Sequence, residues 1–169
     1  MEEYFVLSWI AWKVGVVLTS PEDSWISQRL SPDDLRAMGA VVAQLSDQQS
    51  ISLLELLFSW QAHVHKFEAD LSLPKSDRSA WGAYDLIAAL ILRDHISEGL
   101  DGLDAHVRAR VEAVLAEIDN KFISYTEPDD LLRVEKIDAR PDRRREWWWK
   151  RIPSVGPARD EVILYSGIR

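Results

Sequence analysis

The chain has 169 residues, of which 47% are hydrophobic and 28% are charged, and it contains no cysteine. This composition is typical of one folded globular domain, and the lack of cysteine excludes a disulfide framework, a thiolate metal site and a cysteine nucleophile. With 20 basic and 28 acidic residues the formal net charge is −8, which disfavours general nucleic-acid affinity and favours cationic partners.

An apolar run, Tyr4–Leu18, opens the chain. It follows Glu2 and Glu3 rather than a basic leader, and it contains Lys13. The run lacks the features of a secretory signal and is too short to cross a hydrocarbon core of about 30 Å, so we expect a cytoplasmic protein with no membrane segment. Its valines and tryptophans suit a buried strand as well as a helix, and we favour a helix because no strand partner is evident.

Helix-start signals recur along the next 60 residues. Two of them consist of a capping serine, a proline and two acidic residues that complement the helix dipole. A third has the S-x-x-E spacing of a capping box and opens a segment that is apolar on nearly every side. These signals lie in TSPEDSW (from Ser20), LSPDDLRAMGAVVAQL (from Ser31) and SLLELLFSWQAHVHKFEADL (from Ser52, with Glu55).

Two more helices follow from apolar periodicity. The first covers residues 81–96, and the second is capped by Asp101 or Asp104. Apolar residues of the second helix recur at intervals of four, three, four and four: Val107, Val111, Val114, Ile118 and Phe122. We expect five tryptophans to be largely buried in the core: Trp9, Trp12, Trp25, Trp60 and Trp81.

These patterns predict an all-α fold, an irregular bundle of five or six helices in a single domain, residues 1–169. Residues 1–122 form the helical body. Residues 123–169 are interrupted by four prolines and form an irregular strap over that body, in which only residues 129–137 and 158–164 suit short helices.

No pattern for catalysis, cofactor binding or metal binding stands out. The chain lacks a G-x-S-x-G elbow and any glycine-rich phosphate loop. His63 and His65 point about 200° apart on a helix, so they cannot share a metal as an i, i+4 pair would. We therefore expect no enzyme and no cofactor; an unfamiliar active site would need a pocket that gathers His63, His95 or His106 with a carboxylate.

Acidic residues cluster at the predicted helix starts. Each pair can simply complement a helix dipole, but together they can form one negative surface that docks on a cationic protein. Asp85 and Arg93 lie near one helix face, which is either a solvated face or a partner-binding edge. The candidate docking residues are Asp85, Arg93, Asp94, Asp101, Asp104, Asp129 and Asp130.

Residues 140–151 combine basic and aromatic side chains. Six basic residues against two acidic ones give this segment a net charge of +4, which leaves −12 in the rest of the chain. The strap can insert two indoles over the helices while its arginines pair with the acidic body, which we favour. Alternatively the segment is a partner interface, or it binds nucleic acid, which the acidic body disfavours. The residues concerned are Arg143, Arg144, Arg145, Trp147, Trp148 and Trp149.

The leading hypothesis is a non-enzymatic, acidic protein-binding module. Small acidic immunity proteins neutralise a toxin by docking on it, and a cationic enzyme is the partner that this charge would attract. The alternative is a nucleic-acid-binding or regulatory module that uses residues 140–151.

Overall fold

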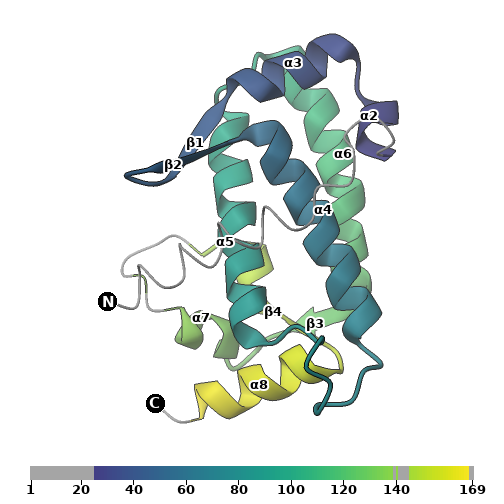
Figure 1. Cartoon of the computed structure of the whole chain (residues 1–169), viewed down its shortest axis with the longest axis vertical. Coiled ribbons are helices and arrows are strands. Elements are labelled where there is room, and N and C mark those ends of the chain that lie inside the picture. Colours follow the sequence, from purple (N-terminus) through teal and green to yellow (C-terminus); the bar gives the residue numbers. More distant parts are fainter. Residues whose placement is uncertain (1–24, 139, 141–144, 168–169) are drawn as a thin grey trace. The chain divides into compact units, whose positions relative to one another are not determined.

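The computed structural model describes residues 25–138, 140 and 145–167. Over these residues the chain forms seven α-helices, one 3-10 helix and two antiparallel two-stranded sheets (Figure 1). The fold is mainly helical, as predicted, but the two small sheets make a purely α description imprecise. In chain order the elements are α2 (Trp25–Arg29), α3 (Pro32–Ala40), β1 (Val42–Ser46), β2 (Gln49–Ser52), α4 (Leu53–Asp70), α5 (Ala83–Leu100), α6 (Ala105–Ser124), β3 (Thr126–Pro128), α7 (Arg133–Ile137), η2 (Trp147–Lys150), β4 (Arg151–Pro153) and α8 (Pro157–Ser166).

The chain divides into two compact units. The first contains residues 1–62 and 91–119, and the second contains residues 63–90 and 120–169. The predicted strap therefore belongs to the second unit together with residues 63–90. Several predictions lie outside the described residues: the secondary structure of residues 4–18, the helix start at Ser20, and the burial of Trp9 and Trp12.

In the first unit, α3 starts where the sequence predicts and ends earlier. The Ser31 hydroxyl accepts a hydrogen bond from the Asp34 amide, and the Asp34 carboxylate accepts one from the Ser31 amide, both at 3.1 Å. The helix ends at Ala40, and residues 42–52 form a β-hairpin instead of continuing it. The predicted helix is wrong here because β-branched valines follow Ala40 and because alternation buries Leu45 while Gln44 stays exposed.

The starts of α4 and α6 match their predicted caps. The Ser52 hydroxyl accepts from the Glu55 amide at 3.2 Å, and the Glu55 carboxylate accepts from the Ser52 amide at 2.9 Å, which completes the capping box before α4. Asp104 caps α6 by accepting hydrogen bonds from the amides of His106 and Val107. The five periodic apolar residues of α6 are all buried, as predicted.

A buried polar triad connects α4, α5 and α6 within the first unit. Arg93 donates from Nε and Nη2 to the two carboxylate oxygens of Asp119, at 3.1 and 2.9 Å. The indole Nε1 of Trp60 donates to Asp119 Oδ1 at 2.9 Å. A buried charge is destabilising without its partner, so the triad favours one alignment of α4, α5 and α6 relative to each other.

In the second unit, α8 helps to cap α5. The Gly82 amide donates to Asp85, and the Ala83 amide donates to Oε2 of Glu161, both at 2.9 Å. A Cβ atom at Gly82 would lie 1.9 Å from that same Glu161 oxygen. A larger residue at this position would therefore displace the Glu161 carboxylate, the far end of a flexible side chain, from the start of α5.

The strap is more regular than predicted, because β3 and β4 form an antiparallel pair within it. The Arg151 side chain donates to the Thr126 hydroxyl at 2.7 Å and to the Ile123 carbonyl at 3.2 Å, so it closes the last turn of α6. Both short helices predicted in the strap are present as α7 and α8. Over the described residues, no helix has the length and apolar character needed to span a membrane.

Candidate functional site

Three of the seven predicted docking residues are buried. Arg93, Asp94 and Asp129 are 6%, 8% and 2% exposed, so the face predicted for Asp85 and Arg93, either solvated or partner-binding, is wrong at Arg93. Arg93 faces inward because it pairs with Asp119. Asp129 faces inward because its carboxylate accepts a hydrogen bond at 2.8 Å from the Val134 amide in the first turn of α7.

The remaining four predicted residues differ in exposure. Asp85 is half-buried and is engaged at the start of its own helix, α5. Asp101 and Asp104 in the first unit and Asp130 in the second are exposed. The exposed part of the predicted set is therefore Asp101 and Asp104 in the loop before α6, together with Asp130 in the second unit.

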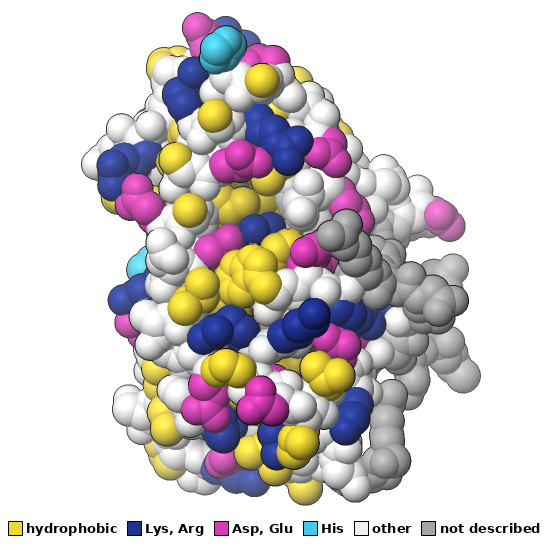
Figure 2. Space-filling view, turned by 180° about the vertical axis from the view of Figure 1, so that it is seen from behind, with side chains coloured by type: hydrophobic (Ala, Val, Ile, Leu, Met, Phe, Trp, Pro, Cys, Tyr) yellow, Lys and Arg dark blue, Asp and Glu magenta, His cyan; other side chains and the backbone are white. Residues whose placement is uncertain are grey.

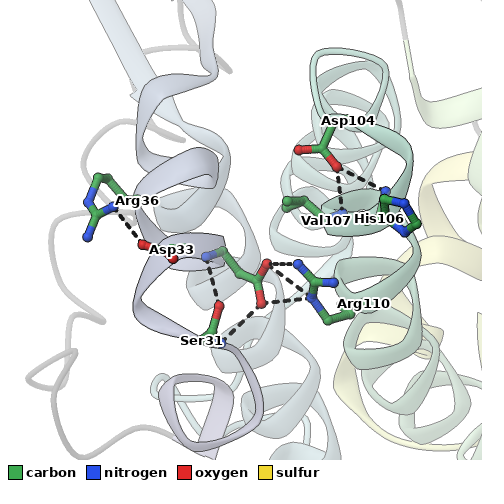
Figure 3. A network of polar contacts seen from close by, with 8 residues as sticks. Ser31, Asp33, Arg36, Asp104, His106, Val107 and Arg110 are labelled. Atoms are coloured by element: carbon green, nitrogen blue, oxygen red, sulfur yellow. Dashed lines mark hydrogen bonds and ion pairs between the residues drawn. The ribbon is translucent and has the colours of Figure 1, made fainter.

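Figure 3 shows the adjoining starts of α3 and α6, with Ser31, Asp33 and Arg36 at α3 and Asp104 and Arg110 at α6. Arg110 on α6 donates from Nε to both carboxylate oxygens of Asp34 on α3, at 3.1 and 3.0 Å. Asp104 lies one helical turn before Val107, and its charge acts on Arg110. We give the name α3–α6 acidic cluster to the carboxylates at or near the starts of these two helices: Asp33, Asp34, Asp101, Asp104 and Glu112. Arg108, which binds Asp101 and Glu112, lies about 200° around α6 from Arg110, which binds Asp34, so the cluster spans two sides of α6.

One arginine bridges two exposed acids of the cluster. Arg108 donates from Nη1 to Asp101 and from Nε to Glu112, both at 2.8 Å. A Cβ atom at Gly102 would lie 3.2 Å from Val41, which places the loop before α6 against the end of α3. Sequence reasoning missed Arg108 and Glu112, although their i, i+4 spacing is a signal for a pair on one helix face.

Two sets of charges interact within the cluster, one around Arg110 and one around Arg108. Hydrogen bonds from Arg110 and from Ser31, opposed by burial, lower the pKa of Asp34 to about 2. The carboxylate of Asp34 in turn raises the pKa of Arg110, and Glu112 and Asp101 raise that of Arg108. These shifts hold Asp34, Arg108 and Arg110 in their ionised forms near neutral pH.

Negative charge is concentrated in one of the two units. The sequence of the first unit contains 15 acidic and six basic residues, a net charge of −9, whereas the second contains 13 and 14, a net charge of +1. The described part of the first unit contains 11 carboxylates and five arginines. Each of these arginines has an ion-pair partner. Figure 2 shows one face of the chain, on which acidic side chains lie beside basic ones.

The tryptophans of the strap are arranged largely as predicted. Trp148 and Trp149 are buried, and Trp147 is 37% exposed with its ring edge-on to that of Trp148. The predicted burial of two indoles is therefore confirmed. Trp60 and Trp81 are buried as well, and Trp25 is half-buried.

The arginines beside these indoles do not pair as predicted. Arg140 and Arg145 lie over the Trp149 ring, at 5.3 and 4.6 Å from its centre, and both form ion pairs with Asp138. Their acidic partner belongs to the strap itself rather than to the helical body. Burial disfavours the ionised form of Asp138, but the hydrogen bonds and charge of Arg140 outweigh it and lower the pKa of Asp138. Arg143 and Arg144 lie outside the described residues.

The histidines do not gather around a pocket. His63 is buried against the Trp81 ring, with 4.8 Å between ring centres, whereas His65 is exposed, as their spacing on α4 predicts. Among the described residues, no group of three or more histidines and carboxylates is placed to hold a metal ion. A hollow in the second unit, lined in part by Phe67, Trp81 and Pro153, has room for about one water molecule.

Comparisons of the chain with protein-family models, with curated proteins and with solved structures give no match. The function is therefore argued from the site alone.

Proposed function

We propose that this protein is a non-enzymatic, acidic protein-binding module that docks on a cationic enzyme through the α3–α6 acidic cluster and neutralises it. The observation that carries the proposal is the excess of carboxylates in the first unit. Its described part has 11 carboxylates and five arginines, and each of these arginines already has an acidic partner. The described residues of this unit therefore carry a net charge of −6, which attracts a cationic partner.

The geometry of the cluster suits docking because its backbone is fixed. Asp33 lies in the first turn of α3, between the two capping-box residues Ser31 and Asp34, and Asp104 accepts two hydrogen bonds from the first turn of α6. Rigid acidic groups lose little conformational freedom when they bind. Their long-range field would accelerate encounter with a positive cleft, such as one that normally receives phosphate groups.

The nucleic-acid alternative has less support from the strap. Two of its three indoles are buried, and Arg140 and Arg145 already bind Asp138. Within the described residues of this segment, Trp147 and Lys150 are the exposed aromatic and basic side chains. One partly exposed indole offers little of the stacking surface that single-stranded nucleic acid requires.

The proposal is tested by affinity capture with the tagged full chain at low ionic strength, followed by mass spectrometry. We expect a strongly basic enzyme that is released by salt and that loses activity when the purified chain is added. The double variant Asp101→Asn/Asp104→Asn should capture much less of it, while asparagine at position 104 still caps α6.

The matched control is Asp47→Asn/Asp160→Asn, which removes the same charge from two exposed positions outside the cluster. This control should capture the enzyme as the natural chain does. Capture of an acidic partner, or equal capture by the two double variants, would contradict the proposal.

A further inference from the structure

We draw no further inference here: the strongest candidate, the exposed apolar side chains of the second unit around α7, η2 and α8 (Leu131, Leu132, Trp147, Ile163 and Leu164), carries nothing because nothing in the structure shows what covers them.

Discussion

Arg110 on α6 and Asp34 on α3 form an ion pair in which the carboxylate is fully buried and the arginine side chain is 53% exposed. The pair joins residues that are 76 positions apart in the sequence. Asp34 also closes the capping box of α3. One buried carboxylate therefore starts a helix and attaches it to a second helix.

Replacement of this carboxylate should destabilise the first unit. Asp34→Asn removes the charge that Arg110 and Ser31 bind, and because Arg110 is half exposed we expect a loss of about 1 to 2 kcal/mol in the free energy of unfolding at pH 7. Urea unfolding measures this loss. The neighbouring variant Asp33→Asn, which breaks an exposed pair with Arg36, should cost less than about 0.5 kcal/mol.

The same pair predicts a pH dependence. The pKa of Asp34 is lowered from 3.8 to about 2 in the folded protein, so its stabilising contribution is complete above about pH 4 and is lost as the pH falls through 2. The stability difference between the natural chain and Asp34→Asn should therefore shrink between pH 5 and pH 2. A difference that stays constant over this range would show that the carboxylate is not bound as described.

The buried triad gives a larger effect. Asp119→Ala removes the carboxylate that pairs with the buried Arg93 guanidinium, and we expect a loss of about 3 to 5 kcal/mol in the free energy of unfolding. Glu117→Ala, two residues earlier on α6, breaks an exposed pair with Arg29 and should cost less than about 1 kcal/mol. Similar unfolding midpoints for the two variants would argue against a tightly packed triad.

Replacement of two glycines by alanine should change the stability of the protein in opposite directions. Gly156 has φ +95°, and a Cβ atom there would lie 3.0 Å from the Leu71 backbone. Gly156→Ala should therefore lower the free energy of unfolding by about 1 to 3 kcal/mol. Gly39 lies in α3 with open space around it, so Gly39→Ala should stabilise the protein by up to about 1 kcal/mol. Thermal unfolding of the two variants checks the sign of each change.

The strap depends on the planar shape of an arginine. Arg145→Lys keeps the positive charge beside Asp138 but loses the flat guanidinium that covers Trp149, and we expect a loss of about 1 to 2 kcal/mol. Arg36→Lys, at an exposed pair, should change the stability by less than about 0.5 kcal/mol. Equal effects in chemical unfolding would mean that stacking on Trp149 contributes little.

The sequence predicts helices well where local signals and burial agree. The capping residues Ser31, Ser52 and Asp104 act locally, so their patterns specify the helix starts directly. Apolar periodicity likewise identifies the buried face of α6. The β-hairpin was missed because two short strands have few residues in which alternation can be recognised.

The candidate site is less predictable because pairing over long distances decides which charges are exposed. Nothing near Arg93 in the sequence indicates that Asp119, 26 residues later, will bind it in the interior. The same holds for Arg110 and Asp34. Asp101 and Asp104 remain exposed because they lie in the loop before α6, which is a local property and was predictable.

The most direct test of docking through the α3–α6 acidic cluster is the rate at which the chain associates with the proposed cationic enzyme. This rate is measured by stopped flow between 20 mM and 500 mM salt. We expect a rate that falls by about tenfold or more over this range, and a weaker salt dependence for Asp101→Asn/Asp104→Asn than for the natural chain. A rate that does not change with ionic strength would contradict docking through the α3–α6 acidic cluster.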